Sequence, residues 1–80
     1  MKDAVTSETP FLMCSPGVYL FSVRAGVPAP EALSQAAELL EVGHGLMLLA
    51  DEMDSSIARA AATWIVETAH TALLAAISNG

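Results

Sequence analysis

Apolar and polar positions divide the chain into a polar start, two short apolar runs and two long segments with helical periodicity. Residues 1–9 are mostly polar, and we expect them to form a flexible N-terminal tail. Residues 10–80 hold the apolar patterning, and we expect them to form a single helical-hairpin domain.

Two apolar, β-prone runs, 11–14 and 18–23, flank Ser15-Pro16-Gly17. Proline presets its own φ and glycine accepts positive φ, so this tripeptide is a turn signal. The pattern predicts a short β-hairpin. Because an isolated two-stranded hairpin is marginal in water, we expect it to pack on helices or to pair with another chain.

A long helix is predicted from Pro28 or Pro30, either of which suits a first helical turn, to a break at residues 51–56. Its apolar residues recur in steps of three and four and form two adjacent stripes. Gly43 and Gly45 weaken its centre by about 1 kcal/mol each relative to alanine. They indicate close packing against another helix or, alternatively, a kink. The two stripes are Leu33, Ala36 or Ala37, Leu40, His44, Met47; and Ala32, Leu39, Val42 or Gly43, Leu46, Leu49 or Ala50, Met53.

A second helix is predicted from about Ser56 to Ser78, capped by Asp54 or Ser55. The short connection between two helices of similar length indicates an antiparallel helical hairpin. The expected buried stripe is Ile57, Ala61, Trp64 or Ile65, Thr68 or Ala69, Ala72, Leu73 and Ala76. The expected solvated stripe is Arg59, Thr63, Glu67, His70 and Thr71.

Each helix carries an apolar arc that is wider than one partner helix can cover, which indicates an interface. We therefore predict an all-α protein: an antiparallel two-helix hairpin, preceded by a short N-terminal β-hairpin, that dimerises into a four-helix bundle. The predicted interface residues are Leu20, Phe21, Leu46, Leu49, Met53, Trp64, Leu74 and Ile77.

Composition and charge narrow the possible functions. Three Lys and Arg against nine Asp and Glu give a net charge of −6, which argues against direct nucleic-acid binding. One cysteine excludes a disulfide framework. The chain begins without a basic region, and its longest uncharged stretch, 9–23, contains two prolines and a glycine. We therefore expect a soluble cytoplasmic protein that does not enter a membrane.

The stretch Leu20-Phe21-Ser22-Val23-Arg24-Ala25-Gly26-Val27-Pro28, followed by Glu31-Ala32-Leu33, Ala36-Ala37 and Leu39-Leu40, resembles a family of short uncharacterised pseudomonad proteins. That family shows an "LF.V.AGVP" motif, an "EAL..AS.LL" helix and a second alanine-rich helix. The resemblance covers roughly residues 11–77. It implies a bacterial, one-domain protein and points to no catalytic residue.

Candidate chemistry is sparse. His44 and His70 are expected about 15 Å apart in a hairpin, too far for one metal within a protomer. Cys14 has no basic neighbour to lower its pKa, and we expect an inert buried thiol. No catalytic, cofactor-binding or metal-ligating residue is predicted, and we do not expect an enzyme.

The sequence therefore favours a small non-catalytic, homo-oligomeric helical interaction protein, acting as an adaptor, regulator or inhibitor of a protein partner. The alternative is an acidic decoy that blocks the nucleic-acid-binding surface of a partner. The decoy would use the acidic residues Glu31, Glu38, Glu41, Asp51, Glu52 and Asp54, which otherwise serve as a solvated face.

Overall fold

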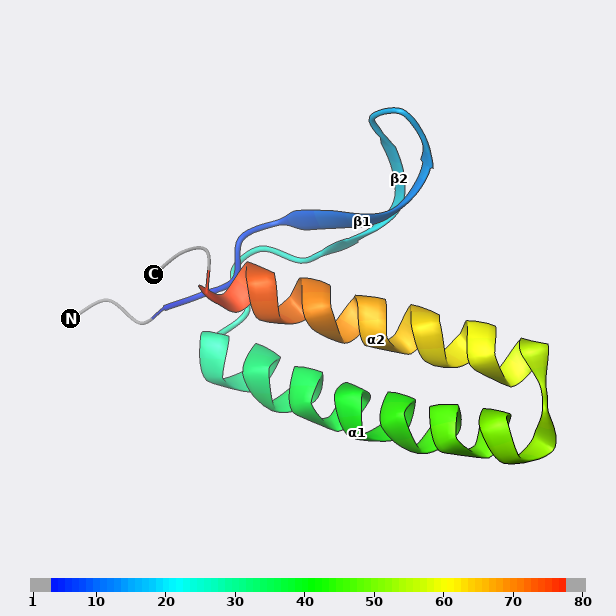
Figure 1. Ribbon diagram of the computed structural model, residues 1–80. Helices are drawn as coiled ribbons and strands as arrows, with labels where there is room; N and C mark the ends of the chain where they lie inside the picture. Colours follow the sequence, from blue (N-terminus) through cyan, green and yellow to red (C-terminus); the bar gives the residue numbers. More distant parts are fainter. Residues whose placement is uncertain (1–3, 78–80) are drawn as a thin grey trace.

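The computed structural model describes residues 4–77. Strands β1 (Thr9–Ser15) and β2 (Val18–Val23) form a two-stranded antiparallel sheet, and helices α1 (Ala29–Met53) and α2 (Ser56–Ile77) follow. The two helices lie side by side and antiparallel, and the strands rise from the end where α1 begins and α2 ends (Figure 1). The predicted helical hairpin is confirmed.

The predicted all-α class is wrong. The strands pair from Thr9 with Val23 to Ser15 with Val18, so an antiparallel sheet stands beside the helices. Its strands include the β-branched residues Thr9, Val18 and Val23 and the aromatic residues Phe11, Tyr19 and Phe21, which suit a pleated surface. The structure shows the two-helix hairpin but does not show the four-helix bundle dimer.

The sheet forms an arm whose turn was predicted correctly. Pro16 and Gly17 make the turn, with Gly17 at φ 76°. The pairing is irregular between Met13 and Ser15, and Leu12 has φ 62° although it carries a branched side chain. A non-glycine residue at positive φ is strained, so β1 departs from regular strand geometry at its centre.

Residues 4–7 hold the root of the arm, where a flexible tail over 1–9 was expected; residues 1–3 lie outside the described part. Thr6 is only 2% exposed. Its N–H donates to the Val27 carbonyl at 2.8 Å, and its carbonyl accepts the Gly26 N–H at 3.0 Å. The Ser7 N–H donates to the Ala75 carbonyl of α2 at 3.0 Å. These bonds attach the segment before β1 to the linker that precedes α1 and to the C-terminal end of α2.

Small residues at intervals of seven form the seam between the helices. The buried positions are Ala29, Ala36, Gly43 and Ala50 on α1, and Ala62, Ala69 and Ala76 on α2. A Cβ added to Gly43 would lie 3.0 Å from Cγ2 of Val66 and 3.3 Å from Cγ2 of Ile65. Gly43 is therefore a point of close helix approach, as one of the two sequence interpretations proposed.

Two parts of the predicted stripes differ from the structure. The buried stripe of the second helix was expected to contain Ile57 and either Trp64 or Ile65. Ile57 is 83% exposed and Trp64 is 61% exposed, whereas Ile65 is half-buried. Thr71 was expected in solvent, but it is buried, and its hydroxyl donates to the Glu67 carbonyl at 2.8 Å. The buried positions of the seam hold small side chains, because these let the helices approach most closely, and Val66 and Ile65 reach the seam beside Gly43.

The turn between the helices uses two local devices. Asp54 ends α1 in the left-handed region, at φ 51°, and its N–H donates to the Ala50 carbonyl. The Ser55 hydroxyl accepts the Ala58 N–H at 3.1 Å, which is the expected N-terminal cap of α2. An exposed ion pair joins Arg59 to Asp51 at 3.2 Å across the turn.

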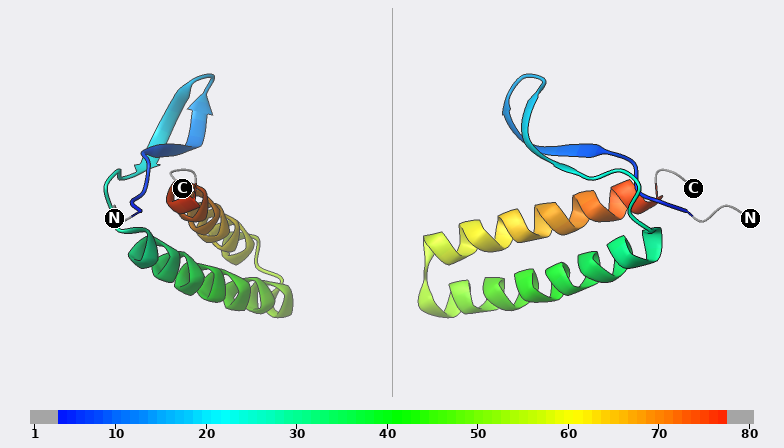
Figure 2. Two further views of the ribbon diagram at one scale, coloured as in Figure 1. Left: turned by 90° about the vertical axis from the view of Figure 1, so that its left-hand side faces the viewer. Right: turned by 180° about the vertical axis from the view of Figure 1, so that it is seen from behind.

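The molecule is a thin layer. The Cα atoms extend 49 × 30 × 13 Å. The two further views show α1, α2 and the arm following one another across the breadth of the layer (Figure 2). A second packed layer of helices would add about 8–10 Å to the thickness. No such layer covers either broad face within residues 4–77.

Candidate interaction surface

None of the large apolar side chains in residues 4–77 is fully buried and many are exposed, whereas the buried hydrophobic residues are alanines. An alanine buries much less apolar area than a leucine, so the seam supplies little of the usual hydrophobic stabilisation. The exposed large hydrophobic residues are Met13, Val18, Tyr19, Leu20, Phe21, Leu33, Leu40, Val42, Leu48, Leu49, Met53, Ile57, Trp64, Val66, Leu74 and Ile77.

Six large apolar residues lie in the half of the hairpin that holds the helix turn, and all of them are exposed except the half-buried Leu46. We call this set the distal patch: Val42, Leu46, Leu49 and Met53 of α1 with Ile57 and Trp64 of α2. Positions seven apart share one side of a helix. Trp64 and Ile57 thus continue the line of Thr71, which is buried at the root of the arm. Val42 and Leu49 continue the line of Gln35, which lines a groove beside the same root. On this side of α2, Thr71 near the root of the arm is buried, whereas Trp64 and Ile57 farther along are exposed.

A second group lies on the other broad face. Residues two apart on a helix point about 200° apart. Leu40 therefore lies opposite Val42 on α1, and Ile77 lies opposite Ala75 on α2. Leu33 is seven residues before Leu40 and joins it. This face is also exposed, although Leu33 and Leu40 are more covered than the distal patch.

The arm carries the third group. Phe11 pairs with Phe21 across the strands, with ring centroids 5.8 Å apart, and Met13 pairs with Tyr19 on the same face. Leu20 lies on the other face of β2, because successive side chains alternate. All residues from Met13 to Ser22 are exposed. Neither face of the arm is covered along this length.

The structure places the eight predicted interface residues on all three groups. Leu20 and Phe21 lie on the arm, and Leu46, Leu49, Met53 and Trp64 belong to the distal patch. Leu74 is exposed on α2. Ile77 belongs to the second group, with Leu33 and Leu40. Seven of the eight are exposed, and Leu46 is half-buried. Their role as an interface stays a prediction.

The predicted interface set omits residues that the structure places on these surfaces, among them Met13 and Tyr19 of the arm and Leu33, Leu40, Val42 and Ile57 of the helices. The signal that could have found the helical ones is the seven-residue spacing of Ala29, Ala36, Gly43 and Ala50. This spacing marks the seam and so fixes which apolar residues lie outside it.

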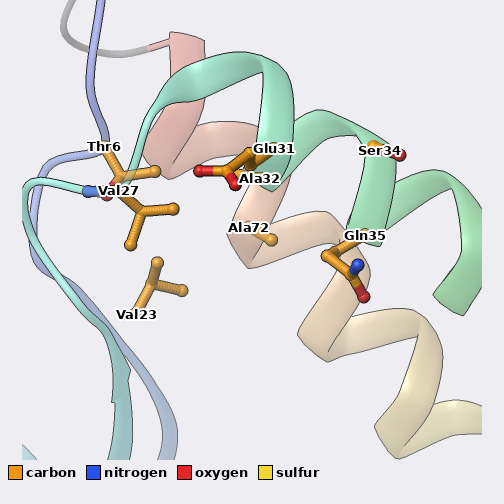
Figure 3. A pocket seen from close by; sticks show the side chains of 8 residues that line it. All are labelled: Thr6, Val23, Val27, Glu31, Ala32, Ser34, Gln35 and Ala72. Atoms are coloured by element: carbon orange, nitrogen blue, oxygen red, sulfur yellow. The ribbon is translucent and has the colours of Figure 1, made fainter.

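A groove of about 440 Å³ lies beside the root of the arm (Figure 3). Val23, Val27 and Ala72 make its apolar wall, and Glu31 and Gln35 of α1 stand on its other side. Its remaining lining residues are Thr6, Ala32 and Ser34. This set offers one carboxylate and an amide but neither histidine nor cysteine.

The titratable side chains do not assemble into a site. Within residues 4–77, no group of three or more His, Cys, Asp or Glu is placed to hold a metal ion. Cys14 is exposed on the arm, where a buried thiol was expected. The acidic residues of α1 and of the turn are exposed, as are His44 and His70.

A family model for proteins of unknown function, DUF3077, matches residues 6–76. The chain belongs to the DUF3077 family. The match begins at Thr6, the buried residue at the root of the arm, and ends at Ala76, the last alanine of the seam, so it spans the arm and both helices of this DUF3077 protein. A family without an assigned function is thereby confirmed, and the pseudomonad origin stays a prediction. No curated protein and no solved structure matches the chain.

One helix of this DUF3077 protein, α2, is long and apolar enough to cross a membrane by length and composition. The sequence interpretation had expected no membrane span. The same length and composition occur in helices that pack against protein, so this property is weak evidence for a span.

Proposed function

We propose that this DUF3077 chain is a small non-catalytic interaction protein that associates with further copies of itself and offers its remaining apolar surface to a protein partner. The observation that carries the proposal is the inverted distribution of side chains, with alanines in the seam and leucines, methionines and a tryptophan outside it. Contiguous exposed apolar surface of this kind is typical of interaction sites.

The thinness of the layer supports the proposal. A stable domain normally buries the apolar side of one layer of secondary structure against another layer. This chain supplies one layer, 13 Å thick between its outermost Cα atoms, with apolar residues on both broad faces. A second copy would supply the missing layer.

The surface area that the chain exposes also supports the proposal. The chain exposes 5607 Å². A compact monomer of 8.3 kDa exposes about 4,600 Å² by the usual scaling of area with mass. The excess of about 1,000 Å² is comparable with the area of about 800 Å² that each partner buries in a standard interface.

Substitution in the distal patch tests the proposal. We expect the purified chain to be oligomeric, and Trp64→Glu to weaken its self-association by about 30-fold or more, the effect of losing a central aromatic anchor. Thr63→Glu is the matched control, because Thr63 is exposed, adjacent in sequence and outside the patch. Light scattering with mass readout measures both variants, and circular dichroism checks that both keep their helices.

Equal masses for the two variants would contradict the use of the distal patch, and a monomeric parent chain would contradict self-association.

The salt dependence of partner binding distinguishes the acidic decoy from an apolar interaction surface. Apolar contacts with a partner persist in about 1 M salt, where charges are screened beyond about 3 Å, whereas an acidic decoy dissociates from its partner.

A further inference from the structure

We propose that β2 pairs along its free edge with β2 of a second copy, antiparallel, to give a continuous four-stranded sheet. The inference rests on the proposed function, since it names one of the contacts through which the copies associate. It begins from the arm, which projects from the helices as only two strands (Figures 1 and 2). Three or more strands, or packing on a helix, are normally needed for a stable sheet.

The two edges of the arm differ. One side of β2 pairs with β1, and within residues 4–77 no strand pairs with its other side. β2 also contacts α2 less than β1 does. β1 lies nearer to α2, and the segment just before it is bonded to Ala75 of that helix. The outer edge of β2 is therefore the accessible one.

Only β1 carries the features with which proteins protect an exposed edge. Pro10 has no N–H to offer, and the positive φ of Leu12 with the irregular pairing after Met13 distorts the strand. β2 reads Val-Tyr-Leu-Phe-Ser-Val, without proline, glycine or charge. A regular, apolar, exposed edge without such protection is a template for another strand.

Charge favours a second copy as the occupant. The chain carries a net charge of −6, so two copies repel one another over most of their surfaces. Residues 9–23 contain no charged side chain. The arm is thus the surface on which two copies approach without like charges facing each other. Six paired residues per strand extend about 20 Å, and the arms' bare faces add further contact.

The first test is a cysteine series on the full chain with Cys14→Ser. Tyr19→Cys, Leu20→Cys and Phe21→Cys are introduced singly, and Met13→Cys on β1 is the control. Antiparallel pairing about a two-fold axis brings only residues next to that axis within the Cβ distance of about 3.5–4.5 Å that a disulfide requires. We expect mild oxidation to give covalent dimers with one maximum in β2 and none at residue 13.

The second test compares two lysine substitutions that face each other across the arm. Tyr19→Lys places like charges near the two-fold axis, whereas Met13→Lys lies one strand farther away on the same face. We expect Tyr19→Lys to weaken self-association on the order of tenfold, because like charges on directly paired strands repel, and Met13→Lys to change it little. Sedimentation equilibrium gives both constants.

The outcomes separate this inference from the proposed function. If the parent chain is oligomeric but no β2 cysteine cross-links and the two lysine variants associate equally, the edge pairing is refuted and the proposed function stands. If the parent chain is a monomer at every concentration, both are refuted. The cysteine series decides the matter alone if Tyr19→Lys does not fold.

Discussion

Thr6 is the residue that joins the arm to the helices. Its hydroxyl donates to the Arg24 carbonyl at 2.6 Å and accepts the Val27 N–H at 3.1 Å, at a position that is almost fully buried. Buried polar groups must find partners, and here one side chain serves two backbone groups. This makes a polar residue a structural one, which its place in a polar N-terminal run did not indicate.

Thr6→Val keeps the shape of the side chain and removes both hydrogen bonds. We expect the free energy of unfolding to fall by about 1–3 kcal/mol, because the Val27 N–H and the Arg24 carbonyl lose a partner. Thr63→Val, at an exposed position, should change it by less than about 0.5 kcal/mol. Urea denaturation at one protein concentration measures both; equal effects would show that the Thr6 hydroxyl is unimportant.

Gly43 and Gly45 are two residues apart on α1, but alanine substitutions at the two positions should affect the stability of the protein differently. A Cβ at Gly45 meets nothing within 4 Å, whereas one at Gly43 meets Val66 and Ile65. Gly45→Ala should stabilise the protein by about 1 kcal/mol through helix propensity. Gly43→Ala should be less stable than Gly45→Ala by about 1 kcal/mol or more, because the new methyl group crowds α2. Thermal unfolding compares them, and equal midpoints would mean that the helices are not closely packed at Gly43.

At the scale of the elements, the seam depends on small side chains. Ala36 is fully buried between the helices, and Ala37 is exposed beside it. We expect Ala36→Leu to destabilise the protein by about 1–3 kcal/mol through overpacking, and Ala37→Leu to be nearly neutral. Chemical denaturation provides the measurement. Similar stabilities for the two leucine variants would contradict the assigned seam.

Most elements could be predicted from local signals. Pro16-Gly17 marks the arm's turn, Pro30 lies in the first turn of α1, and Ser55 caps α2. The fold class was wrong, because a short sheet of two strands was treated as an appendage of an all-α protein.

The sides of the helices were harder to predict than their bounds. Trp64 and Ile57 fit a buried stripe by hydrophobicity, but the seam is set by how closely the backbones approach, and Ala62 and Ala69 allow the closest approach. Hydrophobic periodicity does not separate a stripe that packs within one chain from a stripe that is left for another. Seven of the eight predicted interface residues are exposed, but the sequence did not divide them among an arm and two faces, and their role as an interface stays a prediction.

The whole molecule is a single layer with an alanine seam, and its stability should depend on what covers that layer. A chain of 80 residues buries a modest fraction of its surface even when compact. With its larger apolar residues outside, this chain would gain from the proposed association much of the hydrophobic stabilisation that other domains obtain from their own cores. Folding and self-association should accordingly be coupled, and the thermal midpoint should rise with protein concentration.

Sedimentation equilibrium of the unmodified chain over a wide dilution series tests this account most directly, with helicity and Trp64 fluorescence recorded on the same samples. We predict a mass of at least twice 8.3 kDa at the upper concentrations, and a joint loss of mass, helicity and tryptophan burial on dilution. A folded species of 8.3 kDa at every concentration, with Trp64 shielded from solvent, would contradict it.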